Sequence, residues 1–457
     1  MSESPQKKQE MSAAELPILV FGDLEGRFEP VIESWKKLAL VRDEFPMIGT
    51  NRVRTHKFVY IGDVIDKGPE NLKIMDMLER SLCNSRQGDP VDVFVVGNRD
   101  VNKLRLWFEL YNYGNCKADC LDMTTDSDVT FRVPGWKDEW ERYVAAEKAR
   151  NPEFEYSHGK KTALEDMVFK ARFLFEKTMG CPQTFDLIVS EVRKLQDDPD
   201  CSLVYCLETY LSYFTPRKGS FFNSLLRGRI IYRQGSSLFV HGGISASNYL
   251  MVPPSTKGGE WHKSKDFDTW LKELQNWYLG CLLSYAEGEL EGVIPLLEYQ
   301  EPPVVNGKWN GKLGNPTSVI HTRVFTDDLK VEFPDPAVMQ DLKKNGIKRI
   351  VHGHSPVGDV ALYRYDPVSE IAIVSTDTSA SGGLPSYIEL SEDSVQIDGF
   401  YRDNIFHCDS RDHRAGKYTP QKGYFFGESQ VGDLKGEHLY IDFEAHPAGF
   451  VVPKYSI

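Results

Sequence analysis

Short apolar runs that end in polar residues recur along the first hundred positions of the chain. Residues 17–25 (PILVFGDLE), 57–63 (KFVYIGD) and 91–98 (VDVFVVGN) each have the pattern of a buried strand that closes on Gly-Asp or Gly-Asn. Apolar residues then recur at helical spacing in 28–41, 70–82 and 101–111. Three consecutive strand–helix units predict an α/β core whose polar residues gather at the carboxyl ends of the strands.

Three further strands are predicted in the second half of the chain. They are SSLFVHGG (236–243), IKRIVHGHS (347–355) and EIAIVSTDTS (370–379), and each again ends in polar residues. Between the two sets of strands, apolar spacing predicts helices at 162–180, 185–195 and 201–214. We therefore expect a helical insert at about residues 102–230, packed over the core.

Aromatic residues of the expected insert allow two interpretations. A nucleotide base could stack on some of them, whereas their helical spacing is typical of core packing, which we favour for most of them. They are Trp136, Trp140, Phe173, Phe175 and Tyr213.

The remaining segments complete the predicted organisation. Residues 250–318 mix Pro/Gly-rich loops with one helix at 269–288, and the chain from 394 onward has the pattern of hairpins, with an Asp-Gly turn at 398–399. Polar residues 1–15 are expected to be a disordered tail. The expected divisions are the tail at 1–15, a main domain at 16–400 that contains the insert, and a hairpin-like extension at 401–457 packed on the core.

Composition narrows the setting of the protein. Of 457 residues, 41% are hydrophobic and 26% charged, and no apolar run reaches the roughly 18 residues of a membrane span. The net charge of −13 argues against a general footprint on nucleic acid, so DNA is not expected as a partner. The amino-terminal residues lack the apolar core of a secretory signal. The eight cysteines show only a lone CxxxC (Cys116, Cys120) and a lone CxxxxC (Cys201, Cys206), which favours reduced thiols and a cytoplasmic protein.

The polar residues at the strand ends form a chemically coherent set. Carboxylates, an amide oxygen and imidazoles suit divalent metal ions, and the absence of cysteine from the set argues against structural zinc. The mixture is typical of a two-metal hydrolase that clamps a phosphoryl group. The set comprises Asp23, Glu25, Asp63, Asp66, Asn98, His241, and His352 or His354.

Five short motifs resemble a known family in order along the chain. GDLEG (22–26), GDVIDKG (62–68), GNRD (97–100), HGG (241–243) and GH (353–354) resemble the GDxHG, GDxxDRG, GNHE, HGG and GH signatures of calcineurin-like metallophosphoesterases, in the phosphoprotein phosphatase branch. The departures from these signatures, with the runs KTMGCPQTF and VSTDTSAS, look closest to eukaryotic ApaH-like phosphatases, whose kinetoplastid members include mRNA decapping enzymes. The resemblance covers roughly residues 17–390.

The resemblance implies a four-layer αββα sandwich with a helical insertion and two divalent ions. By position, Asp23 would bind the first ion, Asp63 would bridge both, and Asn98, His241 and His354 would complete the second. Glu25 stands where the family has a histidine, which shifts the site toward harder ions such as Mn²⁺ or Mg²⁺, with iron and zinc as alternatives, or leaves the first ion weakly held. His352 is expected to be a structural strand residue.

The resemblance also implies catalytic and phosphate-binding residues. Asp66, Arg99, Asp100 and Arg323 are the expected catalytic set, and Lys67, Arg99 and Arg323 are expected to bind phosphate. Arg99 replaces the histidine that protonates the leaving group in the family, and a guanidinium does not release its proton. A phosphate or nucleotide leaving group needs little or no proton, so the replacement favours anhydride substrates.

We therefore expect a phosphohydrolase acting on nucleoside polyphosphates, dinucleoside polyphosphates or capped RNA ends. Two alternatives stay open: a serine/threonine phosphoprotein phosphatase, and a degenerate pseudo-phosphatase that binds a partner. Protein partners would meet the insert or the carboxyl-terminal extension, and no membrane contact is expected.

Overall fold

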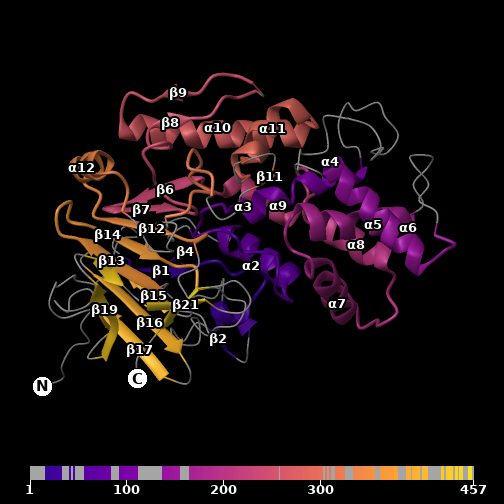
Figure 1. Ribbon diagram of the computed structural model, residues 1–457, viewed down its shortest axis with the longest axis horizontal. Helices are drawn as coiled ribbons and strands as arrows, with labels where there is room; N and C mark the ends of the chain where they lie inside the picture. Colours follow the sequence, from indigo (N-terminus) through magenta and orange to yellow (C-terminus); the bar gives the residue numbers. More distant parts are fainter. Residues whose placement is uncertain are drawn as a thin grey trace, which may run out of the picture.

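Two β-sheets form the centre of the protein. The computed structural model describes residues 16–32, 41–42, 45–46, 56–83, 92–111, 136–154, 164–256, 258–301, 304–305, 308–309, 314–324, 333–355, 361–378, 387–392, 394–401, 404–409, 424–426, 429–435, 438–440, 442–445 and 451–454. The first sheet has the strand order β17-β16-β15-β1-β4-β5 and the second β13-β14-β12-β7-β6. Figure 1 shows both sheets in the left half of the molecule, with helices above and to the right.

The first sheet is built on the three parallel strands expected near the amino terminus. β1 pairs parallel with β4, and β4 with β5, while β15 runs antiparallel on the other side of β1. All of the residues in β1 and β4 are buried because both faces of the sheet are covered. The strands are β1 (Ile18–Phe21), β4 (Lys57–Tyr60), β5 (Val93–Phe94), β15 (Tyr387–Leu390), β16 (Val395–Tyr401) and β17 (Asn404–Asp409).

The second sheet carries the three later strands that the sequence predicts. β12 lies between β7 and β14 and is parallel to both, and β6 and β13 are antiparallel edges. Lys57 of β4 donates to Tyr232 Oη (2.6 Å) and Gln234 Oε1 (2.7 Å) of β6, which ties the sheets together. The strands are β6 (Ile231–Gln234), β7 (Ser237–Val240), β12 (Arg349–His352), β13 (Leu362–Asp366) and β14 (Ile371–Ser375).

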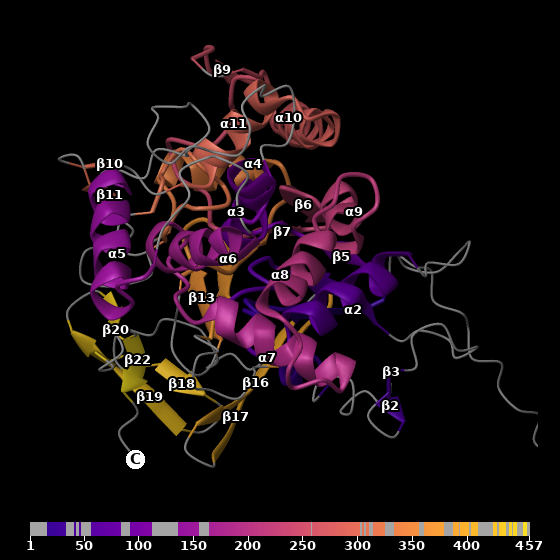
Figure 2. The same ribbon diagram turned by 90° about the vertical axis from the view of Figure 1, so that its right-hand side faces the viewer.

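Helices cover the sheets and form a separate layer at one end. The mixed α/β architecture expected of the metallophosphoesterase fold is confirmed, and Figure 2 faces the helical layer of α4 to α8. The helices are α2 (Asn71–Cys83), α3 (Asn98–Asn102), α4 (Arg105–Tyr111), α5 (Trp136–Arg150), α6 (Leu164–Phe173), the π-helix η1 (Leu174–Thr178), α7 (Thr184–Gln196), α8 (Leu203–Ser212), α9 (Ser220–Arg227), α10 (Phe267–Glu287), α11 (Leu290–Tyr299) and α12 (Pro336–Lys344). Short strands complete the described elements: β2 (Val41–Arg42), β3 (Phe45–Pro46), β8 (Met251–Val252), β9 (His262–Lys263), β10 (Val304–Val305), β11 (Lys308–Trp309), β18 (Tyr424–Phe426), β19 (Ser429–Lys435), β20 (His438–Tyr440), β21 (Asp442–Ala445) and β22 (Val451–Lys454).

The helices in the region of the expected insert are anchored to the sheet domain. Glu191 of α7 accepts hydrogen bonds from the backbone N–H groups of Leu72 and Lys73 at the start of α2, both at 3.0 Å. These bonds satisfy helix-end donors that have no partner within α2. Trp140 and Phe173 are buried and stack edge to face with ring centroids 4.9 Å apart.

Phe175 is buried too, so for these three aromatic residues the core interpretation is confirmed. Trp136 and Tyr213 are half-buried, and the Tyr213 hydroxyl donates to Asp76 (3.2 Å).

Two local predictions were wrong. Residues 250–318 hold two helices, because α11 accommodates Pro295 in its interior where the sequence indicated a loop. Asp398 and Gly399 lie inside β16, where Asp398 pairs with His407 and Gly399 with Phe406. Pairing with both β15 and β17 overrides the local turn preference of Asp-Gly.

Some predictions lie wholly or largely outside the described residues. They concern the tail at 1–15, the expected helix at 28–41 beyond residue 32, and Cys116 and Cys120. The described cysteines Cys83, Cys181, Cys201, Cys206 and Cys281 are free thiols. Within the described part of the chain, no helix has the length and apolar character needed to cross a membrane.

Candidate active site

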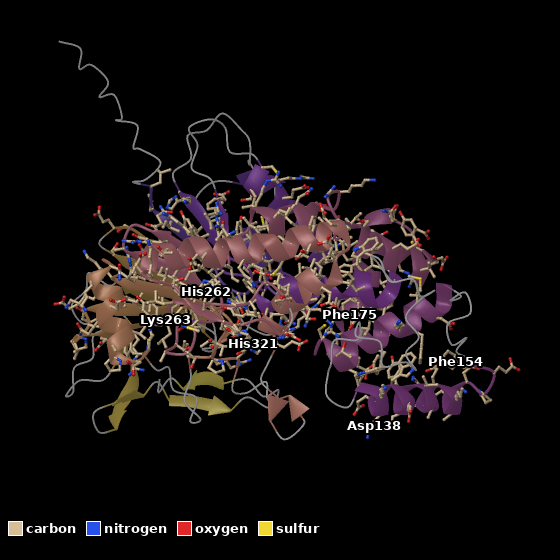
Figure 3. The ribbon with its side chains drawn as sticks, turned by 90° about the horizontal axis from the view of Figure 1, so that it is seen from above. Asp138, Phe154, Phe175, His262, Lys263 and His321 are labelled. Atoms are coloured by element: carbon tan, nitrogen blue, oxygen red, sulfur yellow. The ribbon has the colours of Figure 1, made fainter. Side chains whose placement is uncertain are left out.

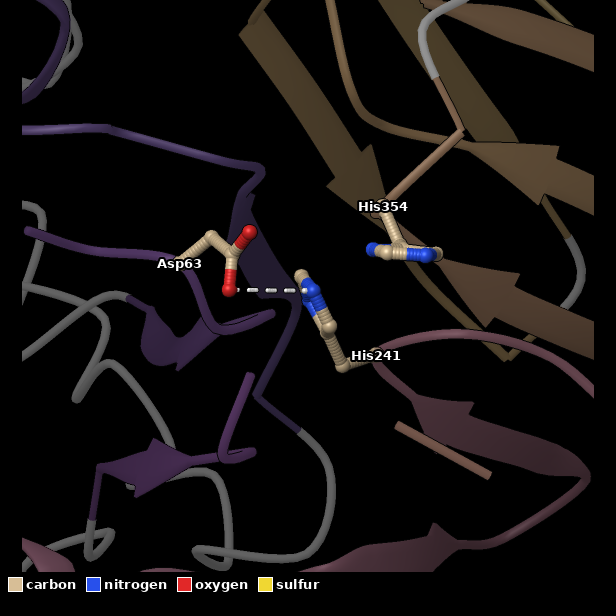
Figure 4. A group of neighbouring side chains, drawn as sticks. All are labelled: Asp63, His241 and His354. Carbon is tan, nitrogen blue, oxygen red and sulfur yellow. Dashed lines mark ion pairs between the residues drawn. The ribbon is translucent and has the colours of Figure 1, made fainter. Parts of the chain in front are cut away.

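Asp63, His241 and His354 converge at the carboxyl ends of strands from both sheets. Asp63 follows β4, His241 follows β7 and His354 follows β12. Figure 4 shows the three buried side chains directed toward one another, and their ligand atoms all lie within 4.8 Å of each other. His241 Nδ1 lies 2.6 Å from the carbonyl oxygen of Ile61, which only accepts, so Nδ1 donates and Nε2 faces Asp63 Oδ1 at 3.2 Å.

Proton affinities in this group follow from its charges. Burial lowers the pKa of His241, but Asp63, the Ile61 carbonyl group and Asp100 together raise it above its ordinary value. Burial raises the pKa of Asp63, but the opposing effects of His241 and Arg99 outweigh it, and the net pKa lies well below the usual range. His241 Nε2 therefore attracts a cation, either a proton or a metal ion.

Asn98 brings an amide to the same point. Its side-chain oxygen faces acceptor atoms and its nitrogen faces donors, and only in the turned orientation would the nitrogen donate to His354 Nδ1 (3.0 Å) and Asp63 Oδ2 (3.2 Å). An amide oxygen that faces a carboxylate and two imidazole nitrogens is the arrangement expected around a divalent cation. These four side chains fit one metal ion.

Backbone conformation concentrates strain at the site. Five non-glycine residues there have φ in the left-handed range: Glu25 (44°), Asp63 (45°), Asp66 (104°), Lys67 (22°) and His354 (62°). Such conformations cost of order 1 kcal/mol or more each and persist where the surrounding structure enforces them. Gly97 is required nearby because a Cβ there would clash with the backbone nitrogen and side chain of Asp63.

Asp23 and Glu25, expected at the first metal, have different surroundings. Both oxygens of Asp23 accept from the backbone N–H of His354, at 3.2 and 3.0 Å. Glu25 Oε1 lies 2.6 Å from Lys67 Nζ and 3.3 Å from Arg99 Nε. The Glu25 carboxylate is thus neutralised by two side-chain cations. Burial and the carboxylates of Asp377, Asp63 and Glu25 raise the pKa of Asp23 well above its ordinary value.

Arg99 lies at the centre of an ion-pair network. Its Nη1 contacts Asp66 Oδ2 at 3.0 Å, and its Nε lies 3.4 Å from Asp63 Oδ2. Burial lowers the pKa of Arg99, but Glu25, Asp66 and Asp63 together raise it above its ordinary value. The guanidinium is therefore held in its charged form.

Asp66 anchors Arg99 from behind. It is fully buried, accepts from Lys103 Nζ (2.9 Å) at the same oxygen that pairs with Arg99, and accepts from Thr184 Oγ1 (2.9 Å) at the other. Burial raises the pKa of Asp66, but Lys103 and Arg99 lower it more, so the carboxylate stays charged. Thr184 begins α7, so the helical layer takes part in positioning Arg99.

Asp100 holds the turn that carries Asn98 and Arg99. Its carboxylate accepts from the backbone N–H groups of Asp63 (2.9 Å), Val64 (3.0 Å) and Gly97 (2.9 Å). Burial and the neighbouring Asp63 raise its pKa to about 7. Because its oxygens serve as acceptors for three backbone donors, Asp100 positions the turn.

Comparison with known proteins finds a family similarity in the first part of the chain. Residues 16–206 match the family described as calcineurin-like phosphoesterase. The closer resemblance to ApaH-like phosphatases stays a prediction. Among curated proteins, no sequence matches.

Solved phosphatase structures show distant similarity to this protein. A cold-active protein-tyrosine phosphatase of a Shewanella species is similar at 11% identity and a TM-score of 0.42, over 89% of this chain and 87% of that one. A protein serine/threonine phosphatase from Saccharomyces cerevisiae is similar at 13% identity and a TM-score of 0.32, over 85% and 80%. Both TM-scores lie below 0.5, so these similarities say nothing about the substrate of this protein.

Two further cations, Lys67 and Arg323, lie at the site or its edge. Lys67 has a side chain that is 29% exposed, so it remains reachable while it pairs with Glu25. Arg323 is half-buried, and burial lowers its pKa, partly offset by Asp377. Within the described residues, Arg323 Nε has no hydrogen-bond partner. Arg323 therefore retains capacity to donate to an anion.

His321 is a site residue that the motifs did not reveal. Its ring lies 4.6 Å from that of His354, in the centre of the molecule in Figure 3. The backbone N–H of Asn315 donates to His321 Nδ1 (3.1 Å), so the ring proton is on Nε2. Burial and Arg323 lower its pKa to about 3, and the ring is neutral. Its position two residues before Arg323 is the one sequence signal that could have indicated it.

His352 has the structural role expected of it. It is fully buried in β12, and its Nε2 lies 2.7 Å from Ser375 Oγ of β14. Lys103 and Thr184 have no counterpart in the motifs, because their importance depends on their contacts with Asp66.

Proposed function

We propose that this protein is a metal-dependent phosphohydrolase that cleaves phosphoanhydride bonds in nucleoside polyphosphates, dinucleoside polyphosphates or mRNA 5′ caps. The observation that carries the proposal is the place of Arg99, which pairs with Asp66, Asp63 and Glu25 at the centre of the site. A guanidinium keeps its protons at working pH. The leaving group therefore receives no proton from Arg99.

Leaving groups differ in their need for a proton. A serine alkoxide is a strong base, and its departure gains about 10²–10⁴-fold from a general acid. A phosphate or nucleotide is already stable as an anion near neutrality. The site thus favours anhydrides, for which the missing acid costs little.

Positive charge at the site suits a polyphosphate chain. Arg99 and Lys67 have side chains that are 20% and 29% exposed, and Arg323 Nε has no hydrogen-bond partner among the residues that the structure describes. Arginine's planar fork can grip two phosphate oxygens, and the lysine adds a point charge. Asp63, Asn98, His241 and His354 would hold a divalent ion, Mn²⁺ or Mg²⁺ on the chemistry of these ligands, which would supply Lewis acidity and lower the pKa of water.

A side-by-side assay tests the proposal. Phosphate and nucleotide release is measured with Mn²⁺ and then Mg²⁺ from diadenosine tetraphosphate, a capped RNA and a phosphopeptide, with Asp63→Asn as the blank. Activity on either of the first two, absent from the blank and from the phosphopeptide, supports an anhydride hydrolase. Activity on the phosphopeptide alone would establish the serine/threonine phosphatase alternative.

Silence on all three substrates, with folded and metal-loaded protein, would indicate the pseudo-phosphatase alternative. The extensive pairing of Arg99 with acidic residues is the observation that keeps this alternative open. A cytoplasmic location, and protein partners at the helical insert or the carboxyl-terminal extension, remain predictions that accompany the proposal.

A further inference from the structure

We propose that the site takes one divalent ion, held by Asp63, Asn98, His241 and His354, and that the Arg99 guanidinium supplies the positive charge at the first metal position. The inference rests on the proposed function only for its metal dependence. The family resemblance implies two metal ions, whereas we infer one metal ion and the guanidinium group of Arg99.

Asp63 shows how the replacement works. Its Oδ1 lies 3.2 Å from His241 Nε2, on the side of the four-residue ligand set. Its Oδ2 lies 3.4 Å from Arg99 Nε, and the backbone N–H of Arg99 donates to Oδ1 at 2.8 Å. In the family resemblance this carboxylate bridges two ions, whereas here it bridges one ligand set and a guanidinium.

Glu25 cannot serve a metal without losing existing partners. Lys67 Nζ lies 2.6 Å and Arg99 Nε 3.3 Å from Glu25 Oε1. A histidine at this position would be neutral and would not attract either cation, whereas a carboxylate does. The substitutions at Glu25, Lys67 and Arg99 are therefore mutually consistent: each charge in the group has an opposite charge beside it.

Arg99 cannot easily move aside for a second ion. Its Nη1 is held by Asp66, which is itself fixed by Lys103 and Thr184 inside the protein. A dication at the first position would lie next to this fixed guanidinium, and like charges at such separations repel strongly where water is excluded. Among the described residues, the one grouping of at least three metal-ligating His, Cys, Asp or Glu side chains is Asp63, His241 and His354.

Metal content of the full-length protein tests the inference without any substrate. Metal-free protein is loaded with Mn²⁺, freed of excess ion and examined by elemental analysis and electron paramagnetic resonance. We expect about one Mn²⁺ per chain and the six-line spectrum of an isolated ion. The double variant Glu25→His, Arg99→His should bind about two ions and show the broadened spectrum of an exchange-coupled pair.

Arg233→His is the matched control, because Arg233 pairs with Asp268 at the surface away from the site. It should keep the metal content of the wild type. Two coupled ions in the wild type, or no bound ion, would overturn the inference. If the double variant fails to fold, the wild-type count and spectrum still decide. One ion in a protein that is inactive on every substrate would leave this inference standing and defeat the proposed function.

Discussion

The two metal positions of this site are built on opposite principles. At the second position, Asp63, Asn98, His241 and His354 direct lone pairs at a common point, and the Asn98 amide lies among acceptors. At the first, Glu25 is already paired with side-chain cations. The second position therefore attracts a cation from solution, whereas Glu25 at the first position is neutralised by side-chain cations of the protein itself.

A few changes from the family motifs are enough to change the charge distribution of a site. Glu25, Lys67 and Arg99 come from two loops and the start of α3, yet they form one group of alternating charges. Asp63 contacts both the group of Glu25, Lys67 and Arg99 at the first metal position and His241 at the second, so it connects the two positions. Four predictions test or sharpen this contrast.

Arg99→His should have the largest effect, because it should shift the substrate preference of the protein toward phosphomonoesters. A histidine beside Asp66 could protonate the leaving group, so hydrolysis of an aryl phosphate should rise by about 10²–10⁴-fold. Diadenosine tetraphosphate cleavage should fall, because the fixed charge is lost. Arg99→Gln is the control that removes the charge without adding an acid. Equal aryl phosphate rates in the two variants would contradict the proton-donor argument.

Lys103→Met should strongly destabilise the protein, because Lys103 pairs with Asp66, the residue that holds Arg99. Lys103 is fully buried and lies 2.9 Å from Asp66 Oδ2. Removing one partner of a buried ion pair leaves a buried charge and costs about 3–5 kcal/mol of unfolding free energy, measured by urea denaturation. Lys177→Met, which breaks a partly exposed pair with Glu176, should cost about 0–1 kcal/mol. Similar losses in the two variants would show that Asp66 is not held by Lys103.

His352→Gln tests whether β12, the strand that leads to His354, makes the stability of the protein depend on pH. Burial lowers the pKa of His352 from 6.5 to about 4, so the folded protein resists protonation of this ring. Its contribution to stability is complete above about pH 6.5 and is lost as pH falls toward 4, by roughly 3 kcal/mol. Glutamine does not titrate, so the variant should lose less stability over that interval, as followed by denaturation at each pH. An unchanged pH dependence would mean that His352 protonates as readily in the folded as in the unfolded chain.

Thr184→Val should have the smallest effect and tests the link from the helical layer to Arg99. The Thr184 hydroxyl donates to Asp66 Oδ1 at 2.9 Å. Loss of a hydrogen bond to a charged group costs about 1.5–3 kcal/mol of unfolding free energy. Ser190→Ala, on the exposed face of the same α7, should stay within about 0.5 kcal/mol of the wild type in the same measurement. A neutral Thr184→Val would separate α7 from the positioning of Asp66.

The strand-end residues could be predicted from the chain because the physics that places them is local. An apolar run that ends in Gly-Asp marks a strand and its carboxyl end, and parallel strands bring those ends to one edge. This reasoning places Asp63, Asn98 and His241 at strand ends and leaves His352 or His354 open at the last one, which the family resemblance assigns to His354, although these residues lie up to 291 positions apart. Local preference failed at Pro295, which α11 accommodates, and at Asp398-Gly399, which pairing on both sides keeps in a strand.

The residue types in the motifs thus determine the fold class and the chemistry available, since carboxylates, imidazoles and guanidinium groups keep their character wherever they lie. Which charges neutralise one another depends on distances of a few ångströms between segments far apart in sequence, because Coulomb energy falls with separation and is screened by water. Lys103 and Thr184 acquire their roles by contact with Asp66 inside the protein. Only the packed structure shows Arg99 beside Glu25 and Asp63, while the ligand atoms of Asp63, His241 and His354 lie within 4.8 Å of one another.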